Sequence, residues 1–297
     1  MPRKKMPMTP TNPTSTNPTN PVSFSPGLIA SDLDGTLLNS QSRLSERTYR
    51  ALDSLDKRDI PFVVATGRPL RWLEQAVAQM PTNPICVVAN GALIYDPFHR
   101  QVLHRTTMSP STLRDLIQVT RKLLPDACIA VERVYTELIP DTGKGPRDEF
   151  LVHSDCRQEW GNLDLPMASA SELASEPAVK FMVRQNDMSS DELAETLFAE
   201  VGHMVNMTYS IDGLVECANP AATKGEALAR ILDYFDLTEE SLVSFGDMPN
   251  DIDMLQLAAW GVAVENAHPS VKQYADEIAP SNDEDGVAQV IERFLDR

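Results

Sequence analysis

The sequence predicts an α/β protein whose doubly wound, mostly parallel sheet is interrupted by an inserted α+β segment. Short apolar runs rich in Val, Ile and Phe recur along the chain, stretches of helical periodicity separate them, and the middle third follows a different pattern. Continuous apolar runs are typical of strands buried on both faces. Their alternation with helices is typical of a parallel sheet that helices cover on both sides.

The core is expected over residues 27–92 and 216–297, on either side of the insertion. Its strands are expected at Leu28–Ser31, Phe62–Ala65, Ile85–Ala89, Leu242–Phe245 and Val262–Val264. Its helices are expected at Ser45–Asp56, Leu70–Gln79, Lys224–Tyr234, Asp251–Ala259 and Gly286–Leu295.

The insertion is expected over residues 93–215. Helical stretches near Ser111–Leu124 and Ser189–Val201 alternate there with extended ones, and Asp212–Gly213 is typical of a hairpin turn. This pattern predicts a mostly antiparallel sheet with helices. The extended stretches are expected near Cys128–Tyr135, Glu149–His153, Val179–Arg184, His203–Tyr209 and Leu214–Cys217.

Composition excludes two classes of function. The 297 residues, 42% of them hydrophobic, can bury a full core. The longest nearly apolar run, Leu255–Val264, is half of the roughly 20 residues that a membrane span needs. A net charge of −17 repels phosphate backbones, so a nucleic acid is not expected as a partner. A small anion can bind only where a cation or oriented N–H groups reverse the sign locally.

The first 26 residues differ from the rest and predict a disordered tail. Pro, Thr, Asn and Ser dominate them, and such a segment buries too little apolar surface to offset its ordering entropy. Arg3, Lys4 and Lys5 imitate the start of a signal peptide, but no apolar segment follows, so we expect a cytoplasmic protein. Four cysteines without a C-x-x-C pair fit buried thiols in a reducing compartment better than a zinc site.

Two carboxylates follow the first strand directly, in the segment Asp32–Leu38 (DLDGTLL). Ligands bind at the carboxyl ends of strands in an open α/β sheet, and residues two apart in extended backbone share a face. Asp32 and Asp34 can therefore face one site, and Gly35 permits the turn that ends the strand. Taken alone, this segment is also explained by a polar turn.

A second acidic cluster, Gly246–Asp251, follows another apolar strand. Asp247 stands at the strand end, as Asp32 does, and Asp251 falls in the first turn of a helix. Helix capping alone would explain Asn250 or Asp251, but not Asp247. Clustered carboxylates repel unless a cation lies between them or one is protonated. Three such acids indicate a hard, oxygen-liganded cation, and Mg²⁺ suits few carboxylates combined with water and phosphate.

Two further segments supply groups that a phosphoryl ligand needs. Thr66, Gly67 and Arg68 end a strand, and the Thr66 hydroxyl with nearby N–H groups can donate to phosphate oxygens. A helix N-cap would also explain Thr66. Lys224 opens a helix at the end where the dipole disfavours a cation, so it either counters clustered negative charge or is simply solvated.

In this order, the motifs D-x-D-G-T-L, T-G-R, K-G and G-D-x-x-N-D resemble those of the haloacid dehalogenase-like hydrolases. The insertion resembles the large α+β cap of the Cof-type (class IIB) phosphatases, and Asn90–Ala92 and Ser281–Val287 also resemble Cof-type sequences. The resemblance covers residues 27–297. It implies a Rossmann-like core, a C2B-type cap that determines substrate specificity, and phosphatase activity.

The resemblance also implies a role for each motif. Asp32 would attack phosphorus and form an aspartyl-phosphate, while Asp34 would protonate the leaving oxygen and then deprotonate water. The Asp32 carboxylate, the Asp34 backbone carbonyl and Asp247 would hold Mg²⁺. Asp251 would hold a metal-bound water or orient Lys224, the cation that counters the charge of the transferring group. Phosphate and substrate contacts would come from Thr66, Gly67, Arg68, Asn90 and Asn250.

The expected substrate is a small phosphorylated metabolite, first of all a sugar phosphate, with pyridoxal phosphate, nucleotides and flavin-precursor phosphates behind it. Arg68, Asn90 and the stretch Val179–Arg184 are candidates for contacts with the leaving group. Two alternatives remain: a phosphotransferase or phosphomutase acting between sugar hydroxyls, and a module that binds phosphorylated ligands without turnover. Such a module could lose the acids or Lys224, yet all are present.

Overall fold

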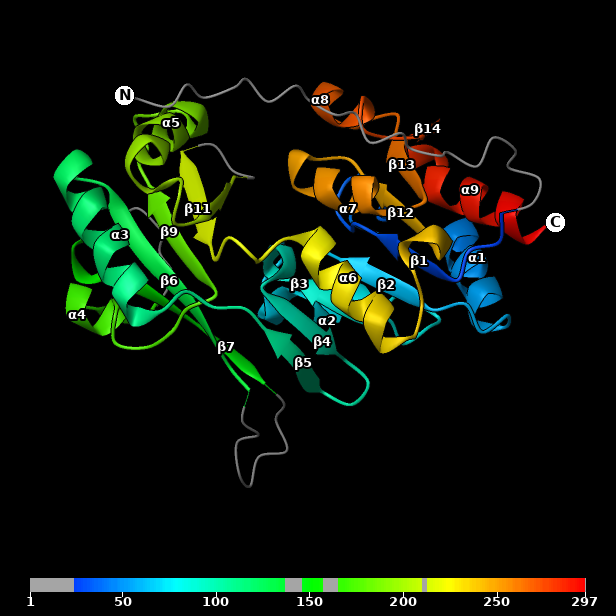
Figure 1. Ribbon diagram of the computed structural model, residues 1–297, viewed down its shortest axis with the longest axis horizontal. Coiled ribbons are helices and arrows are strands. Elements are labelled where there is room, and N and C mark those ends of the chain that lie inside the picture. The colour runs from blue at the N-terminus through cyan, green and yellow to red at the C-terminus, as the bar shows by residue number, and fades with distance from the viewer. Residues whose placement is uncertain (1–23, 137–145, 157–164, 210–212, 297) are drawn as a thin grey trace, which may run out of the picture.

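A computed structural model describes residues 24–136, 146–156, 165–209 and 213–296. The chain forms two sheets, each with its own helices, that lie side by side (Figure 1). We call the eight-stranded sheet and its helices the core, and the six-stranded sheet and its helices the cap. The core contains the two ends of the described chain, and the cap is built from its middle third.

The core sheet has the strand order β14-β13-β12-β1-β2-β3-β4-β5. The first six strands in this order run parallel, β4 is added antiparallel to β3, and β5 is added antiparallel to β4. β1 lies between β12 and β2, so Ile29 pairs with both Val243 and Phe62. The strands are β1 (Leu28–Ser31), β2 (Phe62–Ala65), β3 (Ile85–Val88), β4 (Leu93–Asp96), β5 (Gln101–Arg105), β12 (Leu242–Gly246), β13 (Trp260–Val264) and β14 (Glu277–Ala279).

Helices cover both faces of the core sheet because its central strands are apolar on both sides. Leu28 and Ala30 pack with α6 and α7 on one face, whereas Ile29 packs with α1, α2 and α9 on the other. This arrangement confirms the predicted doubly wound sheet. The core helices are α1 (Glu46–Asp56), α2 (Glu74–Val77), α6 (Lys224–Tyr234), α7 (Ile252–Leu257), α8 (Pro269–Lys272) and α9 (Gly286–Leu295).

The cap sheet has the order β10-β11-β9-β6-β7-β8 and is antiparallel except between β7 and β8. Its helices pack on one face, where Phe181 and Val183 lie in the apolar cluster, and the other face is turned towards the core (Figure 1). The strands are β6 (Cys128–Tyr135), β7 (Arg147–His153), β8 (Met167–Ala168), β9 (Lys180–Arg184), β10 (Asn206–Thr208) and β11 (Leu214–Ala218). The helices are α3 (Pro110–Leu123), α4 (Ala170–Leu173) and α5 (Ser190–Val201).

The boundaries between core and cap, as the two sheets define them, differ from those expected at residues 93 and 215. β4 and β5 belong to the core sheet, because the turn Ala89–Gly91 leads the chain back antiparallel beside β3. At the other boundary, β11 extends to Ala218 and pairs with β9 and β10 of the cap.

Three expected elements also differ in detail. The helix expected at Leu70–Gln79 is a 3₁₀ turn, Leu70–Trp72, followed by the short α2. Its first turn is held by the cap, since the backbone N–H of Arg71 donates to Asp148. The helix expected from Asp251 begins as a 3₁₀ turn and ends at Leu257, and the extended stretch His203–Tyr209 contains only the short β10.

The tail predicted over residues 1–26 lies outside the described residues as far as residue 23, and so does Asp212 of the expected hairpin turn. Phe24 packs edge-on against Phe294 of α9. None of the helices in the described ranges is both long and apolar enough to cross a membrane.

Candidate active site

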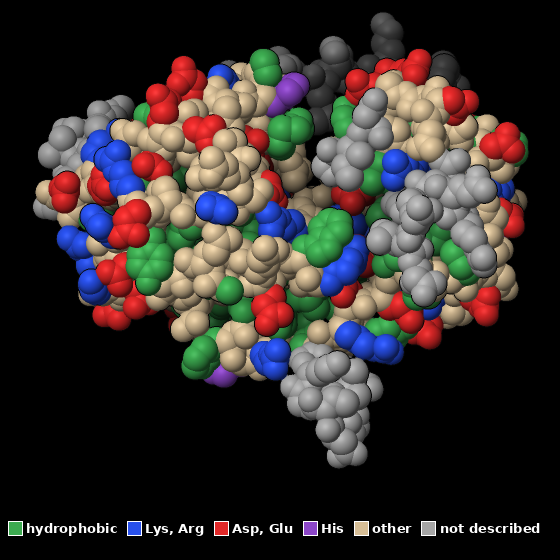
Figure 2. All heavy atoms as spheres, turned by 180° about the vertical axis from the view of Figure 1, so that it is seen from behind, with side chains coloured by type: hydrophobic (Ala, Val, Ile, Leu, Met, Phe, Trp, Pro, Cys, Tyr) green, Lys and Arg blue, Asp and Glu red, His purple; other side chains and the backbone are tan. Residues whose placement is uncertain are grey.

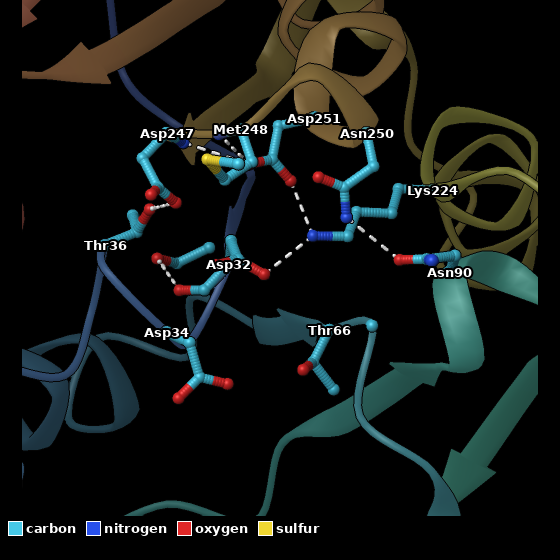
Figure 3. Close-up of polar contacts among 12 residues, drawn as sticks. Asp32, Asp34, Thr36, Thr66, Asn90, Lys224, Asp247, Met248, Asn250 and Asp251 are labelled. Atoms are coloured by element: carbon cyan, nitrogen blue, oxygen red, sulfur yellow. Dashed lines mark hydrogen bonds and ion pairs between the residues drawn. The ribbon is translucent and has the colours of Figure 1, made fainter. Parts of the chain in front are cut away.

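Three buried carboxylates meet at the carboxyl end of the core sheet (Figure 3). Asp32 follows β1 and Asp247 follows β12, and these strands are neighbours, with Ser31 paired to Phe245. The Asp32 N–H donates to the Phe245 carbonyl at 2.9 Å, which extends the ladder to the acid itself. Asp251 comes from the turn before α7. One oxygen of each acid lies within 4.8 Å of the others, and no other such group of metal-ligating side chains occurs within the described ranges.

Lys224 enters this cluster from the first position of α6 and is completely buried. Its Nζ lies 2.6 Å from Oδ1 of Asp32 and 2.5 Å from Oδ1 of Asp251. The start of α6 is held by two further contacts: the Thr223 side chain accepts from the N–H of Glu226, and Oδ2 of Asp253 accepts from the N–H of Gly225 at 2.8 Å. The helix end therefore directs the lysine at the acids, as its position in the sequence suggests.

Asp251 organises the loop that carries Asp247. Its Oδ2 accepts hydrogen bonds from the N–H groups of Asp247 and Met248, both at 2.9 Å, while its Oδ1 accepts from Lys224. A Cβ at Gly246 would lie 2.4 Å from Cβ of Asp251, so only glycine fits beside it. Because both oxygens of Asp251 are engaged, the geometry favours the orientation of Lys224 over the binding of a metal-bound water.

The cluster carries more negative charge than the protein balances. Burial raises the pKa of Asp32 well above its usual range, and Asp251 and Asp247 add to this effect against the opposing Lys224. Burial likewise raises the pKa of Asp247 to about 6, although the Thr36 hydroxyl stabilises its charged form from 2.8 Å. Burial alone would lower the pKa of Lys224, but Asp251 and Asp32 outweigh it and the pKa is raised. Three carboxylates therefore share one ammonium group.

The donor set fits a hard divalent cation such as Mg²⁺. All candidate ligand atoms are oxygens, and Lys224 leaves a formal charge of −2 when the three acids are ionised. None of the described residues donates a hydrogen bond to Oδ2 of Asp32 or to Oδ2 of Asp247. A cation bound among these acids would give Oδ2 of Asp247 a partner, while Oδ2 of Asp32 remains available to a ligand.

Polar residues from three strand ends form a second group next to the acids (Figure 3). Thr66 follows β2, Asn90 follows β3 with a left-handed φ of 57°, and Asn250 lies in the turn after β12. The Asn250 amide donates to Oδ1 of Asn90 at 2.9 Å, and the Asn90 N–H donates to the Thr66 carbonyl at 3.1 Å. Gly67 closes the group, since a Cβ there would lie 2.9 Å from Oδ1 of Asn90. The predicted phosphate-contact residues are thus brought together.

Asp34 is held apart from the buried acids. Its side chain is half exposed and lies in the fork of Arg68, whose Nε and Nη2 donate to the two carboxylate oxygens at 2.7 and 2.6 Å. The partnership with Asp34 raises the pKa of Arg68. The side chains of Asp32 and Asp34 therefore point in different directions, although they are two residues apart (Figure 3).

Three residues that hold the site together were not predicted from the sequence. Thr36 binds Asp247, Asp253 binds the start of α6, and the Asn266 amide donates to the Gly35 carbonyl at 2.7 Å. Each carries a signal that could have identified it: Thr36 stands within the first acidic motif, Asp253 follows the second one, and Asn266 lies just beyond β13 at the same edge of the sheet.

Similarity to known proteins extends over almost the whole chain. The family model described as haloacid dehalogenase-like hydrolase matches residues 29–291. The 5-amino-6-(5-phospho-D-ribitylamino)uracil phosphatase YitU of Bacillus subtilis (strain 168) is 26% identical over 282 residues, which cover 91% of this chain and 98% of that protein. Phosphatase YwpJ of the same organism is 27% identical over 293 residues, covering 90% and 99%.

Solved structures are also similar to this chain over almost its whole length. SMU.1108c from Streptococcus mutans UA159 is 28% identical and has a TM-score of 0.76, covering 92% of this chain and all of its own. The subclass IIB sugar phosphatase BT4131 is 20% identical with a TM-score of 0.70, covering 90% and 98%, and therefore shares the fold. The predicted core and inserted cap are thus a known architecture.

Proposed function

The chain belongs to the haloacid dehalogenase-like hydrolases and is a phosphatase, and we propose that it cleaves small phosphate monoesters with Mg²⁺ through an aspartyl-phosphate intermediate. One observation carries the proposal: Asp32, Asp247, Asp251 and Lys224 converge at one end of the core sheet, although up to 219 positions separate them in the chain. Family membership alone supports hydrolysis. The convergence supports this particular chemistry.

Asp32 is the proposed nucleophile. Lys224 holds its Oδ1, which leaves Oδ2 with lone pairs directed at a ligand. In the first step Oδ2 bonds to phosphorus as the bond from phosphorus to the leaving oxygen breaks. In the second step a water oxygen bonds to phosphorus, the bond to Asp32 breaks, and inorganic phosphate is released. A displacement by a fixed carboxylate and a second one by water thus replace a single direct displacement by water.

Asp34 is the proposed acid and base. It gives a proton to the leaving oxygen in the first step and takes one from the attacking water in the second. Both of its oxygens are held by Arg68 in the structure, so the carboxyl group must leave the guanidinium fork before it can carry a proton. An anionic substrate supplies a competing partner for Arg68, which links substrate binding to the release of Asp34.

Mg²⁺ would be held by the carboxylates of Asp32 and Asp247 and by the backbone carbonyl of Asp34. When bound, it neutralises charge on the phosphoryl oxygens, which is the main catalytic requirement of phosphoryl transfer. Lys224 contributes a fixed positive charge from the other side of Asp32, and Asp251 keeps that lysine in place. The hydroxyl of Thr66 and the amide of Asn250 would donate to the phosphoryl group, and their position beside Lys224 and Asn90 supports this role (Figure 3).

The proposed substrates are phosphate esters of sugars or sugar alcohols. YitU and two further similar proteins from Bacillus subtilis, YcsE and YwtE, are named as phosphatases of 5-amino-6-(5-phospho-D-ribitylamino)uracil, in which the ester is carried by a ribityl chain. Sugar phosphates and ribityl phosphates present similar hydroxyl groups next to the phosphate. This shared chemistry supports one substrate class.

The test is a phosphate-release screen over phosphorylated sugars, sugar alcohols, pyridoxal phosphate and nucleotides, with Mg²⁺ and with EDTA. We expect Mg²⁺-dependent release, highest with the sugar and sugar-alcohol esters, and none from Asp32→Asn. Near-normal turnover by purified Asp32→Asn would refute the covalent route. Activity that EDTA leaves unchanged would refute the metal assignment.

A further inference from the structure

The cap reaches the phosphate-contact residues through the face of its sheet that carries no helices. Seen from behind, a hollow separates the core from the cap, and acidic and basic side chains gather along it (Figure 2). On β9, Phe181 and Val183 point to the cap helices, so Lys180 points the other way. Lys180 lies directly opposite Glu132 of β6, and Glu216 lies on the neighbouring β11. Charged side chains of three adjacent strands thus face the core.

Lys180 is buried at this interface, with 3% of its surface exposed. Its Nζ donates to Oε1 of Glu216 at 2.9 Å and to the backbone carbonyl of Gly67 at 3.1 Å. The first contact lies within the cap, whereas the second crosses to the core. A buried lysine requires compensating partners, and here one of them is a peptide group of the segment that contacts phosphate.

The contact with Gly67 fixes a peptide group that in turn orients Thr66. The carbonyl of Gly67 and the N–H of Arg68 belong to the same planar peptide unit. With the carbonyl on Lys180, the N–H of Arg68 donates to Oγ1 of Thr66 at 3.1 Å. Because Oγ1 of Thr66 accepts this hydrogen bond through a lone pair, its own proton remains available for a different acceptor. The cap lysine thereby determines where the Thr66 hydroxyl donates.

A second cap residue holds the same group of side chains. The Asn90 amide donates to Oγ1 of Thr208 on β10 at 3.3 Å, while its Oδ1 accepts from Asn250. Gly67 and Asn90 are therefore both tied to the cap. These contacts require a docked cap because their partners lie on different sheets.

We propose that Lys180 is a positioning residue that completes the phosphate-binding segment Thr66–Arg68 from across the interface, so that phosphate is bound tightly only when the cap is docked. The inference rests on the proposed function, because it assumes that this segment binds the phosphoryl group. This role of Lys180 differs from a direct contact with the leaving group, for which the sequence makes the stretch Val179–Arg184 a candidate. A leaving-group contact would affect each substrate differently, whereas a phosphate-positioning residue affects all of them equally.

The test compares two variants that remove ion pairs from the same interface without leaving an unpaired buried carboxylate. In Lys180→Met/Glu216→Gln both charges of the pair disappear. In the control, Arg71→Met/Glu132→Gln/Asp148→Asn, the pairs of Arg71 with Glu132 at 2.9 Å and with Asp148 at 2.7 Å are removed together, without touching Gly67. The measurements are competitive inhibition by inorganic phosphate, kcat and KM for two esters with different leaving groups, and Tm.

We expect Lys180→Met/Glu216→Gln to bind inorganic phosphate about 10-fold more weakly, the effect of one charge-assisted hydrogen bond. KM should rise by a similar factor for both esters. The control should lower Tm but change phosphate inhibition less than about 2-fold, since it removes only structural ion pairs and leaves the contacts of Lys180 with Gly67 and Glu216 in place. Lys180→Arg, which keeps the charge but moves the donor, is measured alongside and should also weaken phosphate binding while the protein stays folded.

Unchanged phosphate inhibition in Lys180→Arg and in a folded Lys180→Met/Glu216→Gln would overturn the inference, as would an equal loss in the control. A KM effect confined to one ester would also overturn it, because that result indicates contact with the leaving group. If the unaltered enzyme hydrolyses esters without being inhibited by phosphate, the assignment of Thr66–Arg68 to phosphate fails instead. The two failures are therefore distinguishable.

Discussion

Replacing Asp247 by Asn should stabilise the metal-free protein and abolish its response to Mg²⁺. Asp247 is held at the end of β12 with Asp32 and Asp251 close by, and burial raises its pKa from 3.8 to about 6. The folded state therefore disfavours the ionised carboxylate. Asn has nearly the same shape, cannot ionise, and still offers an oxygen to the Thr36 hydroxyl.

The size of the effect follows from the change in pKa. About 2 pKa units at about 1.4 kcal/mol each give a cost of about 3 kcal/mol for ionised Asp247 in the folded state. Well below pH 3.8 the carboxyl group is protonated in both the folded and the unfolded chain, so the cost is absent. It develops as the pH rises towards 6 and is complete above that value. Asp247→Asn should therefore raise Tm by about 5 °C at pH 7.5 and by much less at pH 4.

The assay is thermal unfolding in EDTA and in Mg²⁺ across this pH range. Mg²⁺ should raise Tm of the unaltered protein more at pH 7.5 than at pH 5, because protons compete for Asp247 below pH 6. Asp253→Asn is the matched control: its carboxylate accepts from the start of α6, so its loss should lower Tm and preserve the response to Mg²⁺. If folded Asp247→Asn melts at or below the unaltered protein in EDTA at pH 7.5, the electrostatic reasoning is wrong.

Three further changes test other parts of the site. Asp34→Asn should lower kcat by about 10²–10⁴ for an alkyl phosphate but far less for p-nitrophenyl phosphate, whose leaving group needs no proton; an equal loss for both would contradict acid catalysis. Lys224→Met should cost about 3–5 kcal/mol in denaturant unfolding, because Asp32 and Asp251 lose their partner, and adding Asp251→Asn should restore stability but not turnover. Gly246→Ala should cost about 1–3 kcal/mol, since its Cβ would lie 2.4 Å from that of Asp251, and unaltered stability would show that the loop relaxes.

The cluster of buried carboxylates could be predicted because its acids stand next to the strands that position them. Asp32 and Asp247 each follow an apolar run, and parallel strands place such positions on one edge of the sheet. Lys224 was predictable for another reason: a cation at a helix N-terminus needs a nearby negative charge, and the structure supplies two carboxylates. In each case a local feature of the sequence implied a partner elsewhere.

The boundary between core and cap could not be predicted in the same way. β5 has only two apolar residues among five, alternates exposed and partly buried positions, and forms an edge of the core sheet, so it lacks the continuous apolar run that marks the central strands. The interrupted helix after Arg68 has a similar cause. Its periodicity is helical, but its first turn is held by Asp148, which lies 77 positions away from Arg71. Local patterns contain no information about such partners.

The Asp34–Arg68 pair shows why residue types can be predicted where geometry cannot. A spacing of two places both carboxylates on one face only while the backbone stays extended, but β1 ends at Ser31 and the chain already turns at Leu33. Asp34 thus leaves the cluster and meets Arg68, a member of the phosphate-contact segment that the cap lysine also holds through Gly67. The acid, the phosphate contacts and the cap are therefore connected through one short segment, Thr66–Arg68. If Lys180 has the proposed role, a change in cap position would act on this segment first, and the cap would influence the chemistry through Gly67.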